Sequence, residues 1–303
     1  MPAASGHASA FAPVPPAPMP LLRGTRPLKR WRYVAVFCEE LMACAATVQV
    51  GPARQTFWAV LLREGAPREG APHEGESRAR EPQSWAGLHE RTRLLPRRGA
   101  VELSRGRLRV HDRSSGPRAV SVRLDLAFQE DGGIEAVCPH GRGYVWTRKQ
   151  AGVAARGTIA IDRGAPRAIE ALAVIDETAG YHARVTEWRW AAGVGVDPAG
   201  RPLAFNLVEG VNDPPRGSER AVWIAGEPRE VAPVSFAADL SRISGADGSE
   251  LRFTPEAQRN RRENLLVVRS EYRAPFGSFC GTLPGGIPLA RGLGVVEHHR
   301  ARW

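Results

Sequence analysis

The segment Tyr181–Trp190 (YHARVTEWRW) combines imidazole, hydroxyl and indole side chains at a spacing typical of a β-strand. Successive side chains of a strand point to opposite faces, so His182, Trp188 and Trp190 are expected to share one face. This face would suit a ligand cavity, in which aromatic walls supply contact area and a few polar groups orient the ligand. The alternative interpretation is that both tryptophans fill a barrel interior and His182 bonds a neighbouring carbonyl.

Asn206 is a further candidate for the same pocket. It lies between two apolar neighbours on the same face of the predicted strand 203–208. Burying its amide without a partner would cost about 1–3 kcal/mol, so a ligand, a water molecule or His182 should bond it. We therefore predict that His182, Trp188, Trp190 and Asn206 line one pocket.

Two carboxyl groups are candidate acids. The apolar alternation of the C-terminal strand leaves either Glu297 or His298 at the pocket wall, depending on the register. A partly desolvated Glu297 would have a raised pKa and could serve as an acid, whereas a salt bridge to an arginine is its structural alternative. Asp176, next to Glu177, is the second candidate acid, and simple turn chemistry is the alternative for that pair.

Familiar catalytic and metal-binding signatures are missing from the sequence. It contains no P-loop, no H-E-x-x-H and no G-x-G-x-x-G, and phenylalanine replaces the serine of a nucleophile elbow in Gly277–Gly281. The four cysteines form no C-x-x-C pair. His298 and His299 would point to opposite faces of a strand, and no spaced ligand set accompanies them. We therefore predict neither a metal nor a cofactor.

The charge of the chain is high but dispersed. The net charge is +10, and of the 42 basic residues only Lys29 and Lys149 are lysines. The arginines are scattered instead of forming the patch or stripe of a nucleic-acid-binding protein, so no such partner is predicted. No apolar run approaches the roughly 18–20 residues of a transmembrane helix. The Ala/Pro-rich start lacks the features of a signal peptide, which favours a cytoplasmic location.

Short alternating segments separated by Gly, Pro or Asp turns follow one another along the chain, as in Ala119–Phe128. A dozen or more such strands predict an all-β sandwich or barrel. Thr254–Glu256 carries helix-start signals, so a short helix is expected at 255–262. The Pro-rich stretch 1–26 is predicted to be a disordered leader, and the Gly-Ala-Pro repeats within 64–84 a surface insertion.

Four segments match, in order, the pattern of one family: Lys29–Tyr33 (KRWRY), Tyr181–Trp190, Phe205–Leu207 (FNL) and Gly294–Trp303 (GVVEHHRARW). Together they resemble the family called domain of unknown function 2804, over nearly the whole chain. Two departures accompany the resemblance. The Gly-Ala-Pro insertion is extra, and Ser218–Ala221 (SERA) only loosely matches the Thr-Glu-Asn-Ala run usual in the family.

That family is similar to the lipocalin-like carotenoid hydratases and tocopherol cyclases. The resemblance implies two consecutive lipocalin-like antiparallel β-barrel halves, at 27–155 and 156–303, and a single larger β-sandwich is the alternative. It also implies acid-assisted addition to an alkene. In that chemistry a protonated carboxyl delivers the proton, and aromatic faces stabilise the resulting cation.

Three hypotheses for the function follow. The leading one is binding of a hydrophobic or amphipathic small molecule, such as a lipid or isoprenoid, in a barrel cavity. The second is a hydratase, isomerase or cyclase that uses the same cavity, and the third is a structural or interaction protein with plugged barrels. A carboxyl group inside the cavity without an arginine partner would favour the enzyme. A paired carboxylate would favour binding, and a cavity too small for a ligand would favour the third.

Overall fold

The chain is built from β-strands wherever its structure is described. The computed structural model describes residues 13–63, 87–94, 96–117, 119–265 and 268–302, and these contain no helix. Neighbouring strands in both main sheets pair in the antiparallel direction. The predicted all-β fold is therefore confirmed.

The first sheet has ten strands, in the order β6-β5-β4-β3-β12-β11-β9-β8-β7, with β10 also paired to β11. Their bounds are β3 (Lys29–Phe37), β4 (Leu41–Val50), β5 (Ala53–Leu62), β6 (Leu88–Arg93), β7 (Val101–Ser104), β8 (Arg107–Arg113), β9 (Ser121–Phe128), β10 (Ile134–His140), β11 (Gly143–Ile161) and β12 (Arg167–Gly180).

The second sheet has nine strands, in the order β16-β15-β14-β13-β21-β20-β19-β18-β17. Their bounds are β13 (Val185–Val196), β14 (Pro202–Glu209), β15 (Ala221–Ile224), β16 (Glu227–Glu230), β17 (Val234–Phe236), β18 (Arg242–Gly245), β19 (Glu250–Leu265), β20 (Val268–Leu283) and β21 (Ile287–Arg302).

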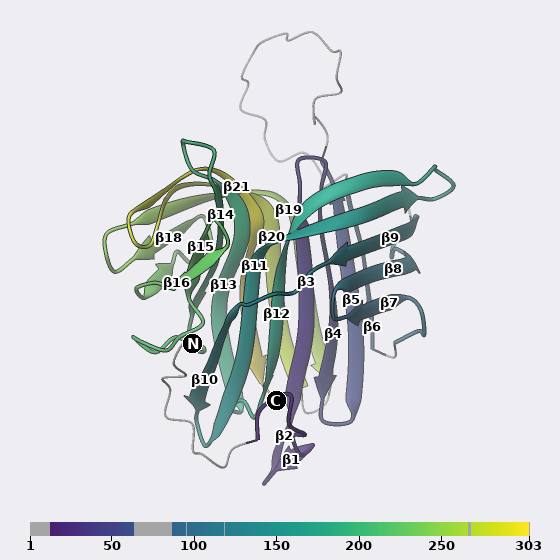
Figure 1. The fold of residues 1–303 in the computed structure, drawn as a ribbon. Helices are drawn as coiled ribbons and strands as arrows, with labels where there is room; N and C mark the ends of the chain where they lie inside the picture. Colours follow the sequence, from purple (N-terminus) through teal and green to yellow (C-terminus); the bar gives the residue numbers. More distant parts are fainter. Residues whose placement is uncertain (1–12, 64–86, 95, 118, 266–267, 303) are drawn as a thin grey trace.

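Each sheet curls into a barrel-like half. Strand β7, at one end of the first sheet, contacts β4 and β5, and β17, at one end of the second, contacts β14. The halves lie side by side, with β11 and β12 next to β13 (Figure 1). The chain passes from one sheet to the other between Gly180 and Val185, not near residue 155, the division expected from the sequence. That position lies inside β11, which forms a hairpin with β12 in the first sheet.

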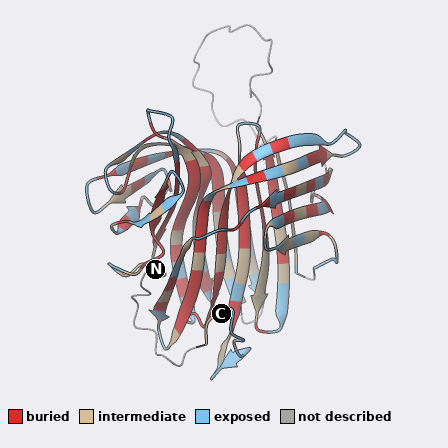
Figure 2. Ribbon diagram, viewed as in Figure 1, coloured by how far each residue is buried: buried red, intermediate tan, exposed pale blue. Residues whose placement is uncertain are grey.

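Side-chain alternation divides the apolar residues among three main cores. On β3, Tyr33 and Ala35 belong to a central core that the two sheets share, whereas Val34 belongs to the core of the first half. On β13, Trp190 belongs to the central core and Ala191 to the core of the second half. Burial is accordingly densest on the central strands (Figure 2). The halves therefore meet through one face of each sheet.

The predicted helix at 255–262 is wrong, because these residues lie within β19. They pair with β20, and the register shifts between Pro255 and Ala257. Proline lacks the amide hydrogen that a ladder needs, and an irregularity of this kind accommodates it. The helix-start signals were local, and pairing with a distant strand outweighs them.

Part of the predicted leader packs against the first half. Residues 22–23 and 26–27 form the small hairpin β1 (Leu22–Arg23) and β2 (Arg26–Pro27). The Tyr181 hydroxyl donates to the Pro20 carbonyl at 2.7 Å. Proline carbonyls accept hydrogen bonds although proline cannot donate one, so a Pro-rich segment can be held this way. Residues 1–12 and the predicted insertion at 64–84 lie outside the described residues.

Candidate functional site

A cavity of about 620 Å³ lies between the two sheets. This volume falls within the roughly 300–1,000 Å³ of small-molecule sites in proteins. Its walls are mostly aromatic and aliphatic, and the main apolar side chains are Trp31, Tyr33, Val48, Phe57, Trp188, Trp190, Val208 and Tyr272. The space is therefore large enough for a ligand, and its surface is of the kind that binds apolar molecules.

The first sheet provides one wall through a row of residues on neighbouring strands. Asp176 on β12 pairs with Lys149 on β11 and with Tyr33 on β3, and the row continues through Ala46 to Phe57. Residues directly opposite each other on paired strands point to the same face. All five side chains therefore border the same cavity.

The second sheet provides the other wall in the same way. Trp190 on β13 pairs with Glu297 on β21. In the adjacent row, Trp188 pairs with His299, which in turn pairs with Tyr272 on β20. These five side chains face the cavity together.

Glu297 lies in this wall with two neutral hydrogen-bond donors, and the charges of Asp176 and Arg259 act on it from farther away. Its side chain is 12% exposed. Trp188 Nε1 donates to its Oε1 at 2.8 Å, and the Tyr272 hydroxyl forms a second hydrogen bond. Burial raises the pKa of Glu297 to about 7, against the effect of these two bonds. No arginine in the described part of the chain lies within ion-pair distance of it. Glu297 therefore titrates near neutral pH instead of near its ordinary pKa of 4.5.

His299, the nearest basic group to Glu297, is itself neutral. Its Nδ1 lies 3.9 Å from Glu297 Oε1. Burial lowers the pKa of His299 to about 3, so the imidazole carries no charge at pH 7. The distance between the two groups therefore does not represent an ion pair under ordinary conditions.

A cluster of rings joins the two walls. Trp31 stacks on Trp188 with centroids 6.2 Å apart and an interplanar angle of 9°, and the His299 ring is 4.3 Å from that of Trp188. His182 lies 5.3 Å from Trp31 and is 2% exposed. Burial lowers the pKa of His182 well below its ordinary value, despite a hydrogen bond to the Gly180 backbone. The buried Nδ1 of His182 has no hydrogen-bond partner of good geometry among the described residues.

Asp176, the second predicted acid, belongs to a buried ionic cluster. Lys149 Nζ lies 2.7 Å from Asp176 Oδ1 and 3.3 Å from Glu219 Oε1. Trp31 Nε1 donates to the other oxygen of Asp176 at 3.0 Å. Burial alone would lower the pKa of Lys149, but the two carboxylates outweigh it and raise that pKa. Asp176 therefore has a permanent cationic partner, in contrast to Glu297.

The remaining two predicted site residues lie outside the cavity wall. Asn206 is fully buried behind it, where it accepts a hydrogen bond from Trp190 Nε1 at 2.8 Å and donates to the Glu219 carbonyl at 2.7 Å. His298 lies on the outer face of β21, 2.9 Å from the carboxylate of Glu187. The register thus turns Glu297 inward and His298 outward.

Several cavity residues were not predicted from the sequence: Lys149, Asn212, Glu219, Arg259, Tyr272 and His299. Two of them carried a signal. Lys149 is one of only two lysines in an arginine-rich chain, and Glu219 lies in the Ser218–Ala221 segment that loosely matches the family run. The others come from β19, β20, β21 and the loop after β14, which only the fold brings to the cavity.

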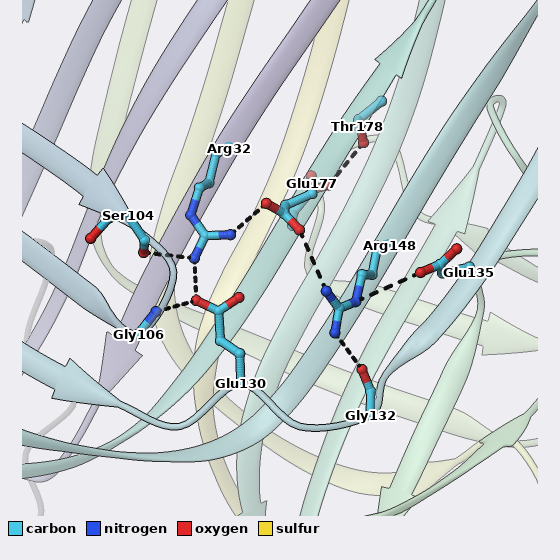
Figure 3. Close-up of polar contacts among 10 residues, drawn as sticks. Arg32, Ser104, Gly106, Glu130, Gly132, Glu135, Arg148, Glu177 and Thr178 are labelled. Atoms are coloured by element: carbon cyan, nitrogen blue, oxygen red, sulfur yellow. Dashed lines mark hydrogen bonds and ion pairs between the residues drawn. The ribbon is translucent and has the colours of Figure 1, made fainter. Parts of the chain in front are cut away.

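The outer face of the first sheet carries a different kind of cluster. Arg32 bonds Glu130 and, at 2.6 Å, Glu177, and Arg148 lies between Glu177 and Glu135 (Figure 3). Arg32, Arg148 and Glu177 alternate along β3, β11 and β12 with the cavity residues. Arg32 and Glu177 thus lie on the face that also carries Val34 and Ile175 of the first half's core.

Two further features, a metal-ion cluster and a membrane-spanning helix, are not found in the described segments. They contain no group of three or more His, Cys, Asp or Glu side chains arranged to hold a metal ion. The same segments contain no helix long and apolar enough to cross a membrane.

The fold and the cavity define an all-β protein with two barrel-like halves and a mostly apolar cavity between them. The chain belongs to the family described as Domain of unknown function (DUF2804), whose model matches residues 18–303. The family expected from the four sequence segments is therefore confirmed. No curated protein matches the chain significantly in sequence.

Two solved structures illustrate its structural similarities. An AttH-like protein from Nitrosomonas europaea is 12% identical, covers 89% of this chain and 92% of its own, and gives a TM-score of 0.48. Kievitone hydratase from Nectria haematococca is 10% identical, covers 89% of this chain and 88% of its own, and gives a TM-score of 0.49.

Proposed function

We propose that the protein binds a hydrophobic or amphipathic small molecule, such as a lipid or isoprenoid, in the cavity between its two sheets. The observation that carries this proposal is the cavity of about 620 Å³ with aromatic and aliphatic walls. Transfer of apolar surface from water to such walls is worth roughly 25 cal/mol per Å². The cavity lies between the two halves and not inside either one, and its volume argues against a purely structural protein.

Trp188 is the wall residue best suited to a test. It stacks on Trp31 of the opposite sheet and donates to Glu297, so its indole spans the middle of the site. Trp146 on β11 is a matched control. It is also buried and also donates through Nε1 to a glutamate, Glu135, at 3.3 Å, but it does not line the cavity.

The experiment is native mass spectrometry of the protein purified from its own host, with circular dichroism to verify folding. The native chain should retain a small molecule, folded Trp188→Ala should lose it, and Trp146→Ala should keep it. Folded Trp188→Ala that still carries the molecule would contradict the proposal. If Trp188 only packs, its removal should cost about 3–5 kcal/mol while the folded protein binds normally.

A second candidate function is acid catalysis on the bound molecule, and the environment of Glu297 favours it. A carboxyl group with a pKa of about 7 and no arginine partner can deliver a proton to a carbon–carbon double bond. Glu297 would become a carboxylate, and the faces of Trp188 and Tyr272 would stabilise the carbocation. Capture of that cation by water gives hydration, and loss of a different proton gives isomerisation. Attack by a second double bond forms a ring and a new cation, which loses a proton to complete cyclisation. In each route the released proton returns to the Glu297 carboxylate, directly or through water.

Deuterium exchange separates catalysis from binding. The native protein, incubated with its co-purified ligand in deuterated water, should place deuterium on a ligand carbon. Glu297→Gln can still accept the hydrogen bond from Trp188 but cannot donate the acid proton, so it should retain the ligand without exchange. Retention without exchange in the native protein would leave binding as the function.

A further inference from the structure

Arg259 on β19 is a cation in the cavity wall with an unmet hydrogen bond. Its side chain is 3% exposed. Its Nε donates to Glu90 on β6 of the other sheet at 2.7 Å, and Nη1 has no partner among the described residues. The guanidinium carbon lies 4.3 Å from the centre of the Phe57 ring and 5.5 Å from that of Tyr272. The two rings and Glu90 therefore leave part of its bonding capacity unused.

Another arginine between the two sheets shows what complete pairing looks like. Arg63 binds Glu256 through Nε and Nη2, at 2.8 and 3.2 Å, and uses Nη1 for Glu39. Arg259 has a single described acidic partner, Glu90, whose side chain is 38% exposed. A buried donor without a partner destabilises the folded state, and a charged donor does so more strongly. Arg259 thus differs from an arginine whose role is to join the sheets.

The register fixes where Arg259 lies relative to Glu297. Arg259 pairs with Ala274 on β20. The pairs Arg273–His298 and Phe276–Val295 set Ala274 opposite Glu297. Arg259 and Glu297 therefore flank Ala274 on the same face, two strand spacings or about 10 Å apart. The methyl side chain between them leaves room for a ligand along the row.

We propose that Arg259 binds the carboxylate of an amphipathic organic acid, whose apolar body extends along the wall towards Glu297 and Trp188. This inference rests on the proposed binding function and specifies its ligand class. A carboxylate matches the planar guanidinium and can use its Nη donors while Nε remains bonded to Glu90. The rings of Phe57 and Tyr272 hold the guanidinium in place by cation–π contact. The polar end of the ligand is thereby separated from the Glu297 acid.

The test uses a matched pair of probes, cis-parinaric acid and its methyl ester, titrated by fluorescence at pH 7. The native protein should bind the acid at least about tenfold more tightly than the ester, which corresponds to 1.4 kcal/mol. In Arg259→Met the acid should lose this advantage while the affinity for the ester stays the same. Arg63→Met, which also removes an arginine between the sheets, should keep the preference.

The possible outcomes distinguish a failure of this inference from a failure of the proposed function. Equal binding of acid and ester by the native protein, or a preference that survives in Arg259→Met, would overturn the role of Arg259 while leaving a ligand cavity. Binding of neither probe would overturn the proposed function and this inference with it. If Arg259→Met does not fold, Arg259→Met with Glu90→Gln removes both charges, and the same loss of preference is expected.

Discussion

Each of the two walls of the cavity contains a carboxyl group. The two side chains are exposed to almost the same extent but have different neighbours. The Asp176 side chain is 11% exposed and that of Glu297 is 12% exposed. Asp176 lies 2.7 Å from the Lys149 ammonium, whereas Glu297 has two neutral donors and a neutral histidine. Burial is equal, so the partner decides the chemistry. Asp176 belongs to an ionic cluster, whereas burial raises the pKa of Glu297, which has no described cation within ion-pair distance, to about 7.

Removing the cation from the first wall should have the largest effect on stability. Lys149→Met leaves Asp176 and Glu219 buried without their cation, and loss of one partner of a buried ion pair costs about 3–5 kcal/mol. Urea unfolding at pH 7 measures the change. The double variant Lys149→Met, Asp176→Asn should recover part of the loss. A cost below about 1 kcal/mol for the single variant would show that the cluster is not structural.

The raised pKa of Glu297 in the second wall should make the stability of the protein depend on pH. Between its ordinary pKa of 4.5 and about 7, Glu297 holds a proton in the folded state that the unfolded chain has released. Its contribution to stability is therefore complete below pH 4.5 and is lost as the pH rises through about 7. In Glu297→Gln this part of the pH dependence should vanish in urea unfolding measured across that window.

Glu187, on the outer face, is the control for that experiment. His298 holds the pKa of Glu187 below its ordinary value through a hydrogen bond. Its contribution has the opposite sign, because it is present above pH 4.5 and lost as the pH falls. Glu187→Gln should therefore leave the slope between pH 4.5 and 7 in place. The same slope in Glu297→Gln as in the native protein would contradict the assignment of Glu297.

A more conservative substitution in the second wall should shift the pKa of Glu297 with only a small loss of stability. Tyr272→Phe removes the hydroxyl that lowers the pKa of Glu297, so that pKa should rise above its native value of about 7. Carbon-13 NMR of labelled glutamate side chains measures the titration. Stability should change by only about 1 kcal/mol, the usual worth of one hydrogen bond. A pKa that stays the same or falls would mean that the two groups do not interact.

The smallest effect is expected on the outer face of the first sheet. Arg148 lies 4.0 Å from Glu177 and 3.9 Å from Glu135, whose side chains are 28% and 58% exposed (Figure 3). Arg148 is itself 18% exposed and also donates to the Gly132 carbonyl at 2.9 Å. Its two ion pairs are nevertheless long and reach partly exposed carboxylates, and such pairs contribute about 0–1 kcal/mol and are screened by salt. Arg148→Met should therefore cost at most about 1 kcal/mol in urea unfolding, and less in 1 M salt. A loss as large as that of Lys149→Met would remove the contrast between the faces.

The fold was largely predictable because alternation is a local property. Segments such as Ala119–Phe128 display it in the sequence, and β9 buries every second residue. Alternation also turned Trp188 and Trp190 to one face, and both line the cavity. His182 reached the same cavity for another reason, since it lies in the connection between β12 and β13 and not on a strand.

The sequence alone did not predict which distant strands pair or in which register they do so. The choice between Glu297 and His298 required the register of β21 against β13. Arg259 looked like one of many scattered arginines, and the helix-start signals before it indicated the wrong element. Only the pairing of β19 with β20 turns its side chain inward. The ammonium beside Asp176 likewise depends on the register of β11 and β12.

The position of the cavity also has a thermodynamic consequence. Each half has an apolar core of its own, whereas the cavity takes its walls from both. A molecule bound there stabilises only the docked arrangement, by about 2.7 kcal/mol at a hundredfold excess over its Kd. Under the proposed function, occupancy would couple the unfolding of the two halves and make it more cooperative. Such a ligand would act as a reversible cross-link between two units that each have an apolar core.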